Sequence, residues 1–205
     1  MLKFYQADNH KYQFHNNEFE LDLSFGTILN MFAFLRKTKA SELGRAKGVL
    51  LFLFDRQFDF DNEKLGDEEL STDDIFSIDL EIFSKYIQAE ERYVQRDFEG
   101  NLMDDEENTP QAYSFDYDSD LIYAAFMQTY KIDLVKERHS LSWSKFNALL
   151  AGLPSDTMFS KVVEIRQTDI NEIKDQQEKI RMALLQKKYE IPKEFREVSK
   201  KVDGK

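Results

Sequence analysis

The sequence lacks cysteine and is poor in glycine and proline, with 7 and 3 residues of 205. The absence of cysteine excludes disulfide bonds, zinc–thiolate sites and cysteine nucleophiles, and it is compatible with a reducing compartment. The scarcity of glycine and proline leaves few chain breaks and favours helices. The longest apolar run, residues 48–54, is far shorter than the ~20 residues that span a bilayer. The N-terminus has no continuous apolar segment typical of a secretory signal, so we expect a soluble cytosolic protein without membrane contact.

Aromatic residues are abundant, and charge is unevenly distributed. The 18 Phe and 9 Tyr provide enough apolar surface for a folded core. The net charge is −11, but residues 55–120 hold 22 Asp and Glu against 5 Lys and Arg, whereas residues 174–205 hold 10 Lys and Arg against 6 acids. The acidic middle disfavours binding to nucleic-acid backbones. It is either a solvated face or a surface that recruits a basic partner.

Hydrophobic periodicity predicts a mainly α fold, a multi-helix bundle with a short N-terminal β-hairpin. Apolar residues alternate on both sides of the turn HNN within residues 11–23, which predicts the hairpin. Helical spacing of apolar residues predicts helices over residues 24–37, 41–54, 72–96, 119–132, 142–152, 156–167 and 169–187. The apolar end of the second, VLLFLF, fits either a buried helix end or a short strand, and we favour the helix. The predicted parts of the chain are the hairpin with the first helices (1–96), an acidic linker (97–113), a C-terminal helical part (114–190) and a flexible polar tail (191–205).

Several helix boundaries are marked by capping residues. Ser24 is the expected N-cap of the first predicted helix, a second serine starts the next one, and Asp73 and Asp74 lie in the first turn of the third. In GLPSDT, residues 152–157, the glycine is expected to end one helix, the proline to block its continuation, and Ser155 or Asp156 to cap the next. Residues 55–71 read as an acidic connector between helices.

The stretch SFDYDSDLIYAAF, residues 114–126, has aspartates at alternating positions, as a calcium loop does. Counting from Asp116, such a loop needs glycine at its sixth position and glutamate at its twelfth. Those positions hold Leu121 and Met127, which cannot supply the sharp turn or the hard oxygen ligand. We therefore interpret Asp118 or Ser119 as a helix cap, with Asp120 in the first turn, and expect no metal site.

Signatures of catalysis are missing. The three histidines, His10, His15 and His139, do not have the i, i+4 spacing of a helical zinc site. Glycine-rich phosphate loops and a GxSxG nucleophile motif are absent, as are basic stretches interleaved with aromatics. We expect no cofactor and no nucleic-acid partner, and we interpret the protein as non-enzymatic, with no catalytic residues.

Residues 113–170 resemble the core of a family of small proteins from phages of Gram-positive bacteria. These proteins are encoded between the genes for the tail tube and tape measure proteins. The resemblance consists of an acidic helix start, an aromatic helix ending in Tyr-x-Ile-Asp-Leu, a Trp and Phe at helical spacing, a Leu-Leu-x-Gly-Leu run and an Ile-Arg pair. The residues that carry it here are Asp118, Asp120, Tyr123, Phe126, Tyr130, Ile132, Asp133, Leu134, Trp143, Phe146, Leu149, Leu150, Gly152, Leu153, Ile165 and Arg166.

The resemblance implies a tail assembly chaperone of a long non-contractile phage tail. Such a protein would bind the tape measure protein, keep it soluble and help recruit tail tube protein. It would act in the cytoplasm of the bacterial host and be absent from the finished virion, and by analogy it would self-associate along its client.

Apolar helix faces in the C-terminal part supply candidate residues for either the core or partner binding. They are Tyr123, Phe126, Tyr130, Trp143, Phe146, Leu150 and Phe159. The acidic middle leaves open a different interaction protein, such as a DNA mimic that inhibits a host nuclease. A metal-dependent hydrolase built on the aspartate-rich stretches is a third reading.

Overall fold

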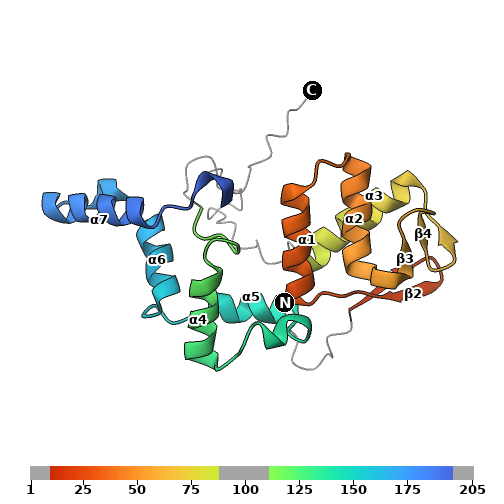
Figure 1. Cartoon of the computed structure of the whole chain (residues 1–205), viewed down its shortest axis with the longest axis horizontal. Helices are drawn as coiled ribbons and strands as arrows, with labels where there is room; N and C mark the ends of the chain where they lie inside the picture. The colour runs from red at the N-terminus through yellow and green to blue at the C-terminus, as the bar shows by residue number, and fades with distance from the viewer. Residues whose placement is uncertain (1–9, 88–110, 196–205) are drawn as a thin grey trace, which may run out of the picture. The chain divides into compact units, whose positions relative to one another are not determined.

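A computed structural model describes residues 10–87 and 111–195. The described chain is mainly α-helical with a short antiparallel hairpin near its N-terminal end, which confirms the predicted fold class (Figure 1). It divides into two compact units. Unit 1 comprises residues 10–87 together with Val135–Ala151, and unit 2 comprises residues 111–134 and 152–195. Most of the predicted linker at 97–113 and the end of the predicted tail lie outside the described residues.

Unit 1 begins with the hairpin, whose inner face packs on the second helix. Tyr12 pairs with Phe19 across the two strands, both are buried, and both rings meet the ring of Phe54 edge-on. His15 takes up a positive φ of 50° in the turn, where the sequence predicts one. The elements of unit 1 are β1 (Lys11–Phe14), β2 (Asn17–Glu20), α1 (Phe25–Lys37), α2 (Glu42–Phe54), β3 (Phe58–Asp59), β4 (Lys64–Leu65), β5 (Glu68–Glu69), α3 (Thr72–Ile82) and α5 (Trp143–Ala151).

Serine caps start the first three helices, as the sequence predicts. The side chain of Ser24 accepts from the Thr27 amide at 3.4 Å, and that of Ser41 accepts from the Gly44 amide at 3.2 Å. Before α3, Ser71 forms a capping box with Asp74, in which each side chain accepts from the other residue's amide. These caps satisfy amides that the helices leave without an internal partner.

Residues 55–71, expected to be an acidic connector, instead fold into a small antiparallel sheet in the order β3-β4-β5. Phe58, Leu65 and Leu70 are buried beneath it and anchor the segment to the core. Each strand has only two residues, which is too short to show the alternation of apolar and polar residues that predicts a strand.

The helix predicted over residues 72–96 is confirmed as far as Ile87, but it is not α-helical throughout. The α-helix α3 ends at Ile82, and one π-helical turn follows to Ile87. The turn inserts one residue, so that Ile87, five positions after Ile82, returns to the buried side of the helix. The remainder of the predicted helix, residues 88–96, lies outside the described residues.

Helix α5 belongs to unit 1 although it is distant in sequence from the rest. Ser24 and Ser142 form an isolated antiparallel bridge, and the amide of Trp143 donates to the carbonyl of Leu23 at 2.8 Å. The ring of Phe25 stacks on Phe146 at 4.8 Å between centroids. This pairing at the start of α1 fixes α5 in the core of unit 1.

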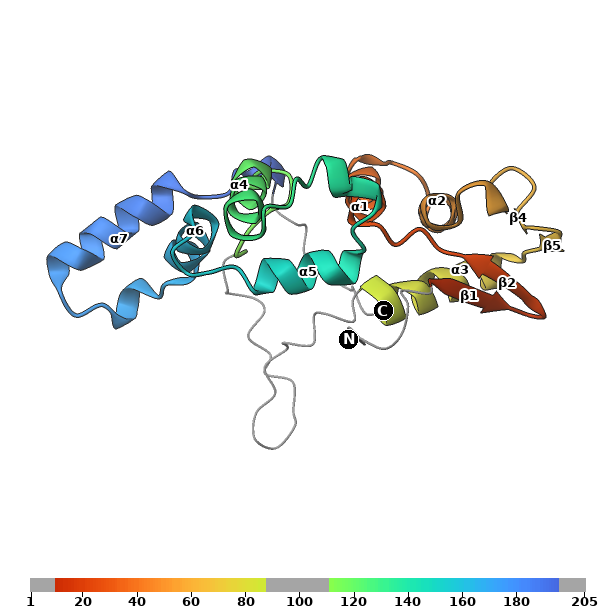
Figure 2. The same cartoon turned by 90° about the horizontal axis from the view of Figure 1, so that it is seen from below.

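Unit 2 contains the helices α4 (Ser119–Tyr130), α6 (Met158–Gln167) and α7 (Gln176–Lys188). Helices α4 and α6 lie side by side, and α7 packs on α6 (Figure 2). The cap of α6 is Thr157, whose hydroxyl accepts from the Ser160 amide, rather than the predicted Ser155 or Asp156. The last helix starts at Gln176, seven residues later than predicted, because Asp175 caps it and a separate 3-10 turn covers Ile170–Glu172.

Candidate partner-binding surface

The residues that the sequence offers for core or partner binding are distributed over both units. Five of them are buried, and the other two are half-buried on α4. In unit 1 they are Trp143, Phe146 and Leu150, and in unit 2 they are Phe126, Phe159, Tyr123 and Tyr130. The five buried side chains pack within the cores of their units and are not displayed to a partner in this conformation.

Trp143 illustrates this placement. Its ring is stacked on Phe146 at 5.6 Å and meets Phe32 edge-on at 5.8 Å. Its indole N–H donates to the carbonyl oxygen of Ile87 at 3.4 Å, which provides the partner that a buried indole needs. The single tryptophan is therefore a core residue that joins α5 to the turn after α3.

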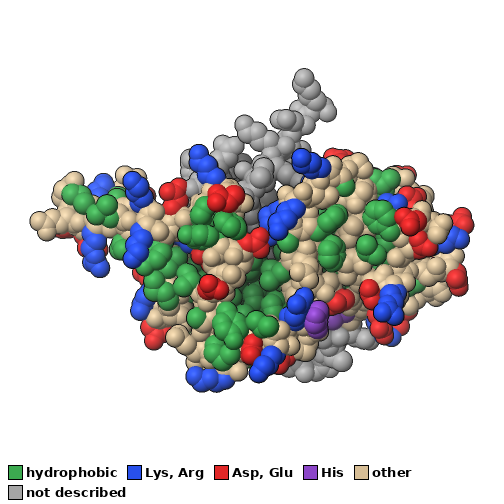
Figure 3. Space-filling view, viewed as in Figure 1, with side chains coloured by type: hydrophobic (Ala, Val, Ile, Leu, Met, Phe, Trp, Pro, Cys, Tyr) green, Lys and Arg blue, Asp and Glu red, His purple; other side chains and the backbone are tan. Residues whose placement is uncertain are grey.

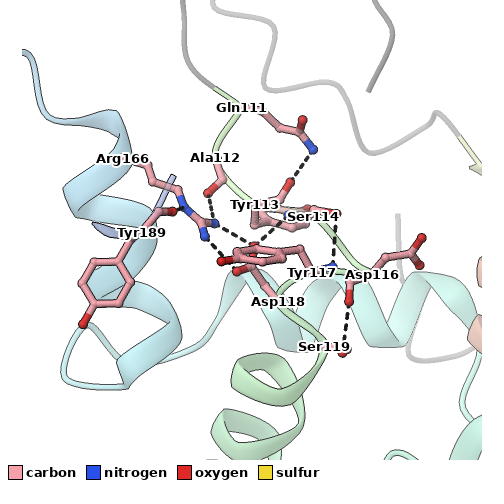
Figure 4. Close-up of polar contacts among 10 residues, drawn as sticks. All are labelled: Gln111, Ala112, Tyr113, Ser114, Asp116, Tyr117, Asp118, Ser119, Arg166 and Tyr189. Atoms are coloured by element: carbon pink, nitrogen blue, oxygen red, sulfur yellow. Dashed lines mark hydrogen bonds and ion pairs between the residues drawn. The ribbon is translucent and has the colours of Figure 1, made fainter. Parts of the chain in front are cut away.

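Arg166 and Asp118 form a buried ion pair at the centre of unit 2 (Figure 4). Two guanidinium nitrogens of Arg166 donate to the two carboxylate oxygens of Asp118 at 2.7 and 2.9 Å, and the exposed fractions of the side chains are 5% and 2%. The remaining contacts of the guanidinium are with the carbonyls of Ala112 at 3.1 Å and Tyr189 at 2.7 Å. We call this set the Arg166 junction.

The aspartate of the junction does not act as predicted. Asp118 occupies the N-cap position of α4, but its side chain makes no capping hydrogen bond. Instead it accepts from the amide of Ser114 at 2.9 Å and from Arg166. Asp118 therefore holds the turn before α4 against α6, while Asp120 lies in the first turn of α4 as expected.

The junction also positions α7. Arg166 on α6 binds the carbonyl of Tyr189, the residue that follows α7. One turn earlier, the side-chain amide of Gln186 donates to the carbonyls of Ile165 and Thr168 at 2.9 and 2.7 Å. None of the residues of α7, all of which the structure describes, is buried. The side-chain hydrogen bonds between α6 and α7 thus lie at the C-terminal end of α7, and Met182 and Leu185 on the same helix are half-buried.

The outward face of α7 carries two exposed aliphatic side chains one turn apart. Ile180 is 54% exposed and Leu184 is 65% exposed. We call this pair the α7 strip. Figure 3 shows hydrophobic side chains on α7 with Lys and Arg side chains around them. The exposed basic residues of the helix are Arg181, Lys187 and Lys188.

The charges around the strip define what it can bind. Arg181 pairs with Glu178 at 3.2 Å, and Lys188 lies over the ring of Tyr189. Lys187 lies one turn beyond Leu184, and the two are neighbours on the helix surface. Such a face is complementary to a helix with an apolar stripe and acidic flanks.

Neither a metal site nor a membrane-spanning helix is present among the described residues. Within residues 10–87 and 111–195 no group of three His, Asp or Glu side chains could hold a metal ion. Over the same residues, no helix is both long enough and apolar enough to cross a membrane.

The family of the chain follows from comparison with known proteins. No curated protein and no solved structure matches it. The family model described as Bacteriophage Gp15 protein matches residues 8–191, which include the described part of unit 1, unit 2 as far as residue 191, and the whole Arg166 junction. The chain therefore belongs to this family of bacteriophage proteins.

Proposed function

We propose that this phage protein is a tail assembly chaperone that binds the tape measure protein, keeps it soluble and helps recruit tail tube protein. It acts without catalysis, in the cytoplasm of the infected bacterium, and it is absent from the finished virion. The membership in a phage protein family supports the phage context. The tail-specific role follows from the resemblance of residues 113–170.

The observation that carries the proposal is the α7 strip. Ile180 and Leu184 are exposed on a helix with no buried residue, so the helix has an apolar face available to a partner. An apolar helix face is a common docking surface for an amphipathic helix of another protein. A long helical client with a repeated apolar stripe would bind it by burial of these side chains.

The charge of the chain supports a role in keeping a client soluble. At a net charge of −11, copies of the protein repel one another away from their binding faces. The basic residues near the strip would favour client segments with acidic flanks.

The proposal is tested by co-expression with the tape measure protein encoded by the same phage. The complex is captured at low salt and at ~1 M salt, where charge interactions are screened within about 3 Å. The wild-type chain should retain a soluble tape measure protein at both salt concentrations. Leu184→Asp should lower its recovery on the order of tenfold, a loss of ~1.4 kcal/mol.

A matched control variant is available in unit 1. The side chain of Val135 is 69% exposed, a fraction similar to the 65% of Leu184, but Val135 belongs to unit 1 and not to α7. Val135→Asp should leave the recovery unchanged. Retention only at low salt would contradict an apolar contact and favour the acidic DNA mimic, and an insoluble tape measure protein with the wild-type chain would contradict the chaperone role.

A further inference from the structure

A second helix of the chain also exposes an apolar strip. On α3, Phe76 is 38% exposed and Leu80 is 72% exposed, one turn apart on the face opposite the buried Ile75 and Ile78. Asp73 is exposed one turn before Phe76. We call Phe76 and Leu80 the α3 strip. Unit 1 thus carries an apolar strip with an acid at one end.

The two strips have matching spacings and opposite charges. On α3 the acid and the two apolar residues stand at positions 73, 76 and 80, and on α7 the two apolar residues and a lysine stand at 180, 184 and 187. When two helices run antiparallel, a residue farther along one helix faces a residue farther back on the other. In one such register Leu184 faces Phe76, Ile180 faces Leu80, and Lys187 reaches Asp73.

The charge of the surrounding chain agrees with this register. Helix α3 lies within residues 55–120, which have 17 more acids than bases, and α7 lies within residues 174–205, which have 4 more bases than acids. The acidic segment around α3 and the basic segment around α7 therefore attract each other at long range, as Asp73 and Lys187 do at the contact. The excess of acid also disfavours contact between two α3 faces.

We infer that α7 of one copy of this protein packs antiparallel on α3 of a second copy. Every chain carries one strip of each kind, and the two faces differ, so the contact is head-to-tail. A contact of this kind leaves a free α3 at one end of a pair and a free α7 at the other, and further copies can add. The self-association does not depend on the proposed function. Because it uses the α7 strip, a bound client would compete with it, in contrast to the association along the client that the resemblance implies. Only this competition rests on the proposed function.

The inference is tested with two single variants of the full chain, Leu80→Asp and Leu184→Asp. Both side chains are mostly exposed, so folding should be retained, and the far-ultraviolet circular dichroism of each variant checks this. In sedimentation velocity the wild-type mass should rise above the 24.3 kDa of one chain as concentration increases. Each variant alone should remain a monomer.

The decisive sample is an equal mixture of the two variants. Leu80→Asp retains a working α7 and Leu184→Asp retains a working α3, so the mixture should form a dimer and stop there. A wild-type chain that stays monomeric at every concentration would overturn the inference. Pairing of α3 with α7 inside one chain would give this same result. Association of a single variant as strong as wild type, or no dimer in the mixture, would also overturn it.

Capture of the tape measure protein separates this inference from the proposed function. Leu80→Asp should abolish self-association and leave client recovery intact, because the α7 strip is unchanged. If the wild-type chain self-associates but does not recover the tape measure protein, the proposed function alone is contradicted. Intact client recovery with a monomeric wild-type chain would contradict the self-association alone.

Discussion

Arg166 and Asp118 lie 48 positions apart in the sequence and meet through two hydrogen bonds of 2.7 and 2.9 Å in a site where both are buried. The same guanidinium also binds the backbone before α4 and after α7. A single side chain therefore connects three segments of unit 2. This geometry gives a structural role to the arginine of the Ile165–Arg166 pair, one of the features on which the family resemblance rests.

Removal of one partner of the pair should destabilise unit 2 strongly. Arg166→Met leaves the carboxylate of Asp118 buried without its cation, at a cost of about 3–5 kcal/mol. Chemical denaturation followed by circular dichroism measures the loss. The double variant with Asp118→Leu should recover the part of the loss that is due to the unpaired charge, but not the part due to the lost hydrogen bonds with the backbone of Ser114, Ala112 and Tyr189. A single variant as stable as wild type would show that the pair is not a structural centre.

The helices could be predicted from the sequence because their signals are local. Ser24 and Ser41 stand directly before apolar residues at helical spacing, and both cap helices in the structure. The β3–β5 sheet could not be predicted, because Phe58, Leu65 and Leu70 are single apolar residues in an acidic stretch. Their burial depends on tertiary contacts, which no local period reveals.

The candidate site was less accessible from the sequence. On α6 the buried residues Phe159, Val162 and Arg166 follow one inward face, so an arginine at an apolar position was the available signal for the junction. Nothing comparable distinguished the α7 strip. Ile180 and Leu184 have the spacing of a core-facing pair, and only the placement of Gln186 and Tyr189 against α6 turns them outward.

Gly26 should not tolerate a larger residue. A Cβ atom at Gly26 would lie 2.5 Å from the backbone carbonyl oxygen of Arg138, which cannot move aside as a flexible side chain can. Gly26→Ala should therefore destabilise unit 1 by about 1–3 kcal/mol, as overpacking does in other cores. Gly44→Ala is the control, because its Cβ would meet only side chains, the nearest at 3.1 Å. Equal stability of the two variants in thermal unfolding would contradict the close approach of Arg138.

Tyr12 should make the stability of unit 1 depend on alkaline pH. Burial, and the hydrogen bond from its hydroxyl to Glu81 at 2.8 Å, raise the pKa of Tyr12 in the folded protein. The unfolded tyrosine ionises near pH 10, so the neutral form stabilises the fold fully below that pH. This contribution is lost as pH rises above about 10. Tyr12→Phe should lose about 1 kcal/mol at neutral pH and show a shallower decline above about pH 10. Parallel declines in the two proteins would contradict the assignment.

The register proposed between α3 and α7 predicts that reversed charges compensate each other. Asp73→Lys places two cations opposite each other at the rim of the contact, and Lys187→Glu places two anions there. Each change alone should weaken self-association by about two- to fivefold, because an exposed pair contributes up to about 1 kcal/mol. The chain with both changes should associate nearly as well as wild type, since the opposite charges face each other again.

Sedimentation velocity at low salt measures all four proteins. Glu178→Lys is the control, because Glu178 precedes Lys187 by nine residues, or two and a half turns, which places it on the opposite side of α7. The change should have little effect on self-association. Additive losses in the double variant would place Asp73 and Lys187 apart and contradict this register.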